Sequence, residues 1–301
     1  MIGSFGKIPS KPDFVRAGHS DAQTRAFEQW LDESCLRLRE CGVEVPAGGV
    51  RFVMRAAEAE NVLIGTLRPS RDAIGRRFPL SVFHALQWSV MEHRWSALPA
   101  LAGPFVESAE QLIADAAALD VERLRMRVTS LWTPTSHDIA SMDSLCAGVL
   151  QNTPWLVVAE RVFGGDRTLD HAAYAFRTFF AALQREGVAA LDCPIAVDLD
   201  LFFWLELLRR VSRSSTFMLL WMEDPLPRLV VSVGGPAPLS LLLALADGSR
   251  EQQQIWPLRT SRPAALEVAA QVLGETLESI RAKSIEHLFA ELARTAGSAG
   301  T

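Results

Sequence analysis

Three short runs of β-favouring residues early in the chain constrain the fold most. They span residues 50–56, 61–67 and 80–86, and all are rich in branched and aromatic side chains. A short acidic turn at Glu58 and Glu60 separates the first two runs, which predicts a hairpin. The third run follows a turn that contains several arginines, so the simplest assembly is an antiparallel sheet.

A helix is predicted before this hairpin. Ser20 and Gln23 have the spacing of a capping box, and Gly42 is a natural stop, so the helix is expected over residues 21–41. Its apolar stripe would cover one face of the sheet. The stripe consists of Phe27, Trp30, Leu31, Cys35 and Leu38.

The rest of the chain repeats the mixture of helices and strands. Helical stripes fill residues 92–151, and they are followed by a predicted helix at 168–187, a strand at 193–200, a buried helix at 201–211, a hairpin of strands at 215–222 and 228–233, and a closing helix at 263–293. We therefore predict an α/β (α+β) protein with a mixed, largely antiparallel sheet flanked by helices. The predicted division is an N-terminal α/β domain over 1–135 and a C-terminal α/β segment over 136–301 that ends in a long helix; one compact unit is the alternative.

Composition and charge exclude several classes of function. The chain has 30 Lys and Arg against 35 Asp and Glu, which argues against a general nucleic-acid binder. Lysines and prolines interrupt the opening residues where a signal peptide would need an apolar run, so a cytoplasmic location is expected. The uncharged stretch 229–246 is broken at Gly234, Gly235 and Pro236, which favours strand, turn and helix over a membrane span. The four cysteines and six histidines show no metal-ligand spacing, so no metal site is predicted.

Two polar pairs are the candidates for chemistry. Arg76 and Arg77 would suit a carboxylate or phosphate, but a solvated turn predicts the same charges and is favoured. Asp198 and Asp200 stand where a strand gives way to a helix, so a capping role is favoured over a catalytic pair. Nucleophile-elbow, zinc-protease and P-loop motifs are all lacking, and neither an enzyme nor a cofactor is predicted.

The opening stretch FGKIPSKPDF favours a stiff structural turn. Pro9 and Pro12 restrict the backbone, and Phe5 and Phe14 are expected to anchor both ends in the core. Lys7, Lys11 and Asp13 are expected to be displayed on its surface, and a second charged turn contains Arg71, Arg76 and Arg77. We predict these six residues as a partner-binding surface, because a rigid turn loses little entropy on binding.

The same stretch resembles the start of the TagF (ImpM-type) accessory proteins of bacterial type VI secretion systems. The resemblance covers roughly the first 90 residues and thins beyond them, although residues 219–248 resemble a later family segment. Pro12 stands where the family usually has glycine, and Met222 replaces the usual second tryptophan or its neighbour. The residues that match the family pattern, and that we predict to be structural, are Phe5, Gly6, Pro9, Phe14, Trp30, Phe52, Gly75, Phe78 and Pro79.

This resemblance implies a non-enzymatic cytoplasmic protein that represses assembly or firing of a secretion machine after translation. Its implied partner is the forkhead-associated-domain scaffold protein of that system. Two rival interpretations are kept: an enzyme that uses Lys7, Arg76 and Arg77 on an anionic substrate, and a sensor that binds a nucleotide or phosphate.

Overall fold

The computed structural model describes residues 1–18, 21–184, 187–212, 214–223, 227–246, 255–259 and 262–298. Its strands are β1 (Ile2–Gly6), β2 (Val15–Ala17), β3 (Val50–Arg55), β4 (Asn61–Arg68), β5 (Leu80–Gln87), β6 (Ala189–Pro194), β7 (Phe217–Met222), β8 (Arg228–Val233) and β9 (Trp256–Pro257). Its α-helices are α1 (Ala22–Glu40), α2 (Trp88–Met91), α3 (Leu98–Leu101), α4 (Gly103–Asp115), α5 (Val121–Thr129), α6 (Ser136–Asn152), α7 (Trp155–Phe163), α8 (Thr168–Leu183), α9 (Asp198–Val211), α10 (Ser240–Ala246), α11 (Pro263–Ser279) and α12 (Ile285–Ser298). Two short 3₁₀ helices are η1 (Trp95–Ala97) and η2 (Ala116–Ala118).

The strands form one sheet that runs through both halves of the chain. Over the described residues its order is β2-β1-β5-β4-β3-β7-β8-β6-β9, and the ladders are antiparallel except that between β6 and β9. Both predicted hairpins, β3 with β4 and β7 with β8, are confirmed. The predicted fold class, a largely antiparallel mixed sheet with flanking helices, is confirmed as well.

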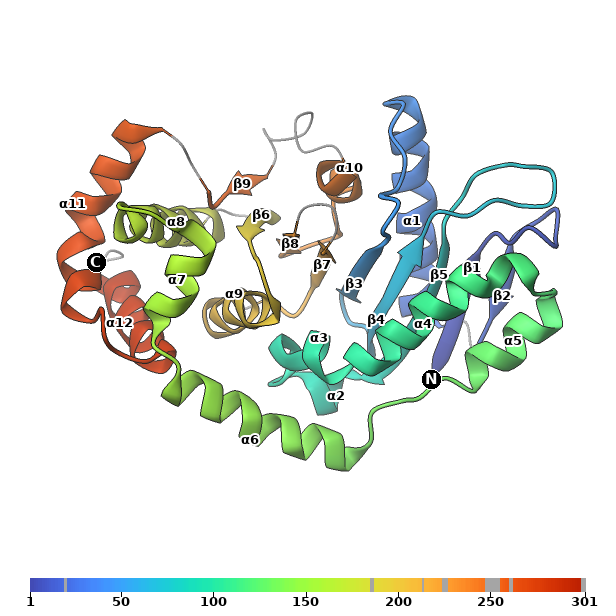
Figure 1. The fold of residues 1–301 in the computed structure, drawn as a ribbon, viewed down its shortest axis with the longest axis horizontal. Coiled ribbons are helices and arrows are strands. Elements are labelled where there is room, and N and C mark those ends of the chain that lie inside the picture. The colour runs from blue at the N-terminus through green and yellow to red at the C-terminus, as the bar shows by residue number, and fades with distance from the viewer. Residues whose placement is uncertain are drawn as a thin grey trace.

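The central strands are buried on both faces, because helices cover both sides of the sheet (Figure 1). In β3, Phe52 and Met54 face a core that includes α1 and α10, whereas Val53 faces a larger core that includes α4, α8 and α9. In β7 the same alternation separates Met218 from Phe217. A layer of helices thus covers each face of the sheet.

Several local predictions are wrong in position. The cap of α1 is Asp21, whose side chain accepts from the backbone N–H of Thr24, and the predicted cap, Ser20, lies outside the described residues. The sixth strand is Ala189–Pro194 rather than 193–200, because Asp200 accepts from the amides of Ala196 and Val197 and so organises these residues as the start of α9. The N-cap of α9 is Val197, and Asp200, the third residue of the helix, accepts from its amide, so Asp200 acts at a helix start as the favoured interpretation proposed; it also pairs with Arg161.

The predicted closing helix is two helices, α11 and α12. The break lies at residues 280–284 and not at Gly274. Trp155 causes it, since its indole N–H donates to the carbonyl of Ile280 and its backbone N–H donates to Lys283, at 2.8 and 3.1 Å. Ile285 in turn donates to Thr153, so the chain is fastened to the α6–α7 junction where the helix would have continued.

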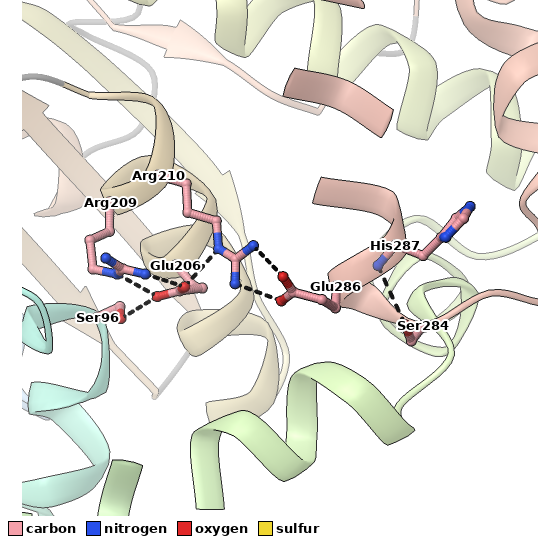
Figure 2. Close-up of polar contacts among 7 residues, drawn as sticks. All are labelled: Ser96, Glu206, Arg209, Arg210, Ser284, Glu286 and His287. Atoms are coloured by element: carbon pink, nitrogen blue, oxygen red, sulfur yellow. Dashed lines mark hydrogen bonds and ion pairs between the residues drawn. The ribbon is translucent and has the colours of Figure 1, made fainter. Parts of the chain in front are cut away.

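A buried carboxylate joins elements from the two parts of the chain. Glu206 in α9 accepts from the hydroxyl of Ser96 in η1 at 2.7 Å, and pairs with Arg209 and Arg210 of its own helix (Figure 2). Arg210 also pairs with Glu286 in α12, at 2.6 Å. The predicted boundary near residue 135 stays a prediction, but this network and the β3–β7 ladder both cross it.

Residues 229–246 fold as β8, a turn and α10, as the prolines and glycines predicted. Within the described part of the chain, no helix has the length and apolar character needed to cross a membrane.

Candidate functional site

Two loops of the N-terminal half are joined into one rigid unit. We call residues 7–13 the opening turn and residues 69–79 the arginine loop. The hydroxyl of Ser70 donates to the carbonyl of Lys7 at 2.7 Å, and the amide of Ala73 donates to the carbonyl of Lys11 at 3.0 Å. The guanidinium of Arg76 donates to the carbonyl of Pro12. These bonds satisfy backbone groups that two separate loops would leave to water.

Asp72 is the centre of this unit. It is only 2% exposed, and its carboxylate accepts from Lys7 Nζ at 3.0 Å and from Arg76 Nε at 2.7 Å. The backbone amides of Ile74 and Arg76 donate to its other oxygen. Burial opposes ionisation, but the hydrogen bonds from Lys7 and Arg76 outweigh it and hold the pKa of Asp72 well below its usual range. The carboxylate therefore stays charged and keeps both cations in place.

Three phenylalanines form the apolar base beneath the loops. The rings of Phe5 and Phe14 stack at 5.3 Å, and Phe78 meets Phe14 edge-on at 4.8 Å. Lys7 Nζ lies 5.1 Å from the centre of the Phe14 ring. Gly6 allows this packing, since its φ is +143° and a Cβ there would lie 2.1 Å from the carbonyl oxygen of Pro79.

A groove of about 690 Å³ opens between the arginine loop and the C-terminal half of α1. We call it the α1 groove. Its apolar lining combines side chains from the aromatic base with side chains from α1 and from the segment that follows it. The apolar members are Phe14, Cys35, Leu38, Val43, Val45, Pro69, Phe78 and Pro79. Such a lining with a few charged groups is typical of a binding site.

The charged groups of the groove differ in how strongly they are held. Lys7 and Arg76 are engaged by buried Asp72, whereas Arg77 pairs with Glu44 through side chains that are 74% and 64% exposed. Because Glu44 follows α1, this exposed pair reaches from one wall of the groove to the other. An exposed pair of this kind contributes only about 0–1 kcal/mol, so a ligand can replace it.

The groove lining includes one thiol, that of Cys35, which is buried. Burial raises the pKa of Cys35 to about 12, and a reactive thiol needs the opposite shift. Among the described residues there is no cluster of three or more histidine, cysteine or acidic side chains that would hold a metal ion. The arrangement is suited to binding.

The structure separates the six predicted partner-binding residues into two groups. Lys7 is 6% exposed, so the expectation that it is displayed on the surface is wrong; the Asp72 carboxylate draws it inward. Asp13, Arg71, Arg76 and Arg77 are exposed and Lys11 is half-buried, all within the joined loops. Their role in binding a partner stays a prediction.

Most of the predicted structural residues lie in or beneath the two joined loops. The exceptions are Trp30 in α1 and Phe52 in β3. Phe5 and Phe78 are buried and Phe14 is half-buried at the base of the groove, while Pro9 is half-buried in the opening turn. Trp30 and Phe52 pack in the core beneath α1, 5% and 0% exposed. Gly75 has a φ of +87° at the tip of the arginine loop.

Sequence reasoning missed Asp72, Arg39 and Glu44. Asp72 appeared as one charge in a turn rich in arginine, and its pairing with Lys7 joins positions 65 apart in sequence. Arg39 and Glu44 were not singled out. The available signal was the concentration of cations around a single acid, since such an acid is commonly their buried partner.

Comparisons with known proteins give a family match for the N-terminal part and a structural likeness over most of the chain. Residues 3–131 match the family model of the TagF N-terminal domain, which is type VI secretion system-associated. A search of the curated proteins gives no match. Among solved structures, the crystal structure of PA0076 from Pseudomonas aeruginosa PAO1 is similar, with a TM-score of 0.50 and 16% identity over 83% of this chain and 96% of that chain. At this identity the likeness shows the fold alone.

Proposed function

We propose that the protein is an accessory component of a bacterial type VI secretion system, because residues 3–131 match the family model of the TagF N-terminal domain. The match to this family carries the proposal. We further propose that the protein acts by protein contact, as a repressor of assembly or firing after translation. The forkhead-associated-domain scaffold protein of the system is the proposed partner.

The site supports a contact function over an enzymatic one. Its most strongly held charges, Lys7, Asp72 and Arg76, satisfy one another and fix two loops. Cys35, the thiol in the α1 groove, has a raised pKa. A preorganised surface with an apolar hollow and exposed arginines at its edge is well suited to holding a partner segment.

A gene deletion tests the proposed function. Removing the gene should raise effector release and the number of assembled secretion machines, while transcript levels of the secretion genes stay unchanged. Reintroducing the gene should restore repression, and purified protein should capture the scaffold. Unchanged secretion in the deletion strain would overturn the regulatory proposal.

The sensor alternative has one specific observation in its favour, the volume of the α1 groove. A ligand at 100 times its dissociation constant would add about 2.7 kcal/mol of stability. Thermal unfolding with nucleotides and inorganic phosphate therefore distinguishes the two proposals. A rise in melting temperature that Arg77→Gln abolishes would favour the sensor.

A further inference from the structure

The arginines that line the α1 groove differ in the partners that they already have. This difference indicates which kind of ligand the groove can bind. Arg76 already donates to Asp72 and to the carbonyl of Pro12, so it is committed to the loop structure. Among the described residues, the acidic partner of Arg77 is the exposed Glu44 alone. Arg39 donates to the carbonyl of Cys35, and no carboxylate in the described residues pairs with it. Two guanidiniums are thus available to a ligand.

Both guanidiniums line the α1 groove, Arg39 from the end of α1 and Arg77 through its pair with Glu44 just after that end, and we call this part of the groove the charged end. Arg39 is in the last turn of α1, and Glu44, which pairs with Arg77, follows that turn closely. The C-terminus of a helix favours cations, so their positive charge is stable there. The other acidic residue that lines the groove, Asp32, lies seven positions before Arg39, which is about 10 Å along the helix axis.

Apolar surface adjoins the charged end. Val43 and Val45 are half-buried in the groove wall, and Leu38 and Phe78 lie deeper, at 2% and 3% exposure. Leu36, one turn before Arg39 on α1, is 54% exposed. A ligand with a carboxylate at the arginines would therefore place its neighbouring group against apolar side chains.

We propose that the α1 groove binds a short peptide segment of a protein partner in which an aspartate or glutamate adjoins a large apolar side chain. The carboxylate displaces Glu44 from Arg77 and accepts from Arg39, while the apolar side chain enters the groove between Val45 and Phe78. Glu44 is then an internal competitor that occupies Arg77 until the segment arrives. The inference rests on the proposed contact function and adds to it the surface and the class of segment recognised.

A nucleotide fits these observations less well. A polyphosphate needs several donors around one centre, and the arginine loop has already used Arg76 and the amides of Ile74 and Arg76 on Asp72. A single carboxylate needs only one or two guanidiniums, which is what the charged end offers.

The test uses purified full-length protein and no secretion component. A display library of random heptapeptides is selected on the protein, and the enriched peptides are synthesised and titrated by fluorescence anisotropy. The selected sequences should combine an acidic residue with a neighbouring leucine, isoleucine, phenylalanine or tryptophan. Arg77→Gln should weaken their binding about 10-fold, the order expected for a charge-assisted hydrogen bond.

Two further variants separate this role from a structural one. Glu44→Gln removes the competitor and should tighten binding about three-fold. Val45→Thr keeps the shape but adds a hydroxyl, and should weaken binding about three-fold. Arg125→Gln is the matched control, because Arg125 is an exposed arginine in α5, distant in sequence from every groove-lining segment, and it should leave binding unchanged.

Several results would overturn the inference: no enrichment of any peptide, enriched peptides without acidic residues, or affinities that Arg77→Gln and Glu44→Gln leave unaltered. Stabilisation by inorganic phosphate or nucleotides without peptide enrichment would assign the groove to a small anion instead. Failure of the proposed function can be distinguished from failure of this inference, because the protein can select peptides even if it does not capture the scaffold. Conversely, scaffold capture that Arg77→Gln leaves undiminished would keep the proposed function and reject the groove as its contact.

Discussion

At the scale of single residues, the fold of the N-terminal half depends on a few positions. At some of them an added side-chain atom would clash with the backbone, and at others removal of a charge would release a loop. Asp72 is the clearest case among charges, because it accepts from two side chains and two backbone amides that belong to different loops. Gly6 is the corresponding case in packing. Both positions are far more informative about the fold than the exposed arginines beside them.

A pair of glycines gives a prediction at this scale. Gly6 and Gly75 both have positive φ, but a Cβ at Gly6 would lie 2.1 Å from the carbonyl oxygen of Pro79, whereas at Gly75 nothing lies within 4 Å. Gly6→Ala should therefore lower the free energy of unfolding by about 3 kcal/mol or more, since backbone must move. Gly75→Ala should cost only about 1–2 kcal/mol of local strain. Urea denaturation of both variants checks this, and equal losses would contradict the close-approach argument.

Residue types alone identified the aromatic anchors but not the pairs that hold the loops. Phe5 and Phe14 were predicted to anchor the stiff turn in the core, and Phe5 is buried while Phe14 is half-buried; Phe78, predicted to be structural from the family pattern, is buried as well. Lys7 was expected at the surface because a lysine without a visible partner normally stays in water. Its partner, Asp72, comes from another loop, and local patterns do not report such contacts.

At the scale of elements, strands were easier to predict than helix ends. The runs of β-favouring residues that form these strands are local, so both hairpins follow from the sequence. The end of α11 does not, because the hydrogen bonds from Trp155 and Ile285 that divide it from α12 are tertiary. A continuous apolar stripe predicts one helix until such a contact is known.

The network around Glu206 yields a prediction for the contact between α9, η1 and α12. Burial opposes ionisation of Glu206, but hydrogen bonds from Arg209, Ser96 and Arg210 prevail and lower its pKa. Because folding lowers this pKa, the ionised Glu206 carboxylate stabilises the folded state at pH values above its ordinary pKa of 4.5. This stabilisation is lost as the pH falls through the pKa of the folded state. Glu206→Gln should therefore lower the free energy of unfolding at pH 7 by about 2 kcal/mol. This figure is reduced to allow for solvent that partly screens the charges of the two arginines.

Denaturant titrations from pH 7 to pH 3 measure this effect. The difference between the parent and Glu206→Gln should shrink as the pH falls below 4.5. Glu278→Gln is the matched control, because the exposed Glu278–Arg281 pair at 3.5 Å should contribute within about 0.5 kcal/mol at any pH. A difference that remained constant down to pH 3 would show that Glu206 acts through packing and not through its charge.

At the scale of the whole molecule, the family match ends at residue 131 while the sheet continues. The β3–β7 ladder pairs Arg51 with Trp221 and Arg55 with Phe217, so the TagF-like part of the sheet has its neighbour strand in the later half. Trp95 stacks on Phe217 at 4.5 Å across the same division. The predicted boundary near residue 135 rests on the stretch TPTSH at residues 133–137, and such a local pattern does not report which strands pair.

Residues 1–135 alone should therefore fail to form a stable, monomeric fold. Without β7, the strand β3 becomes an unpaired edge whose Phe52 and Val53 are otherwise 0% exposed, and such edges promote aggregation. The loss of Glu206 also leaves Ser96 without its partner. Expression of 1–135 should give aggregated protein or broad, poorly dispersed amide resonances, and co-expression with 136–301 should restore a soluble complex by supplying β7. A monomer of 1–135 that unfolds cooperatively, as judged by size-exclusion chromatography and thermal denaturation, would show that the N-terminal part is an independent domain despite the shared sheet.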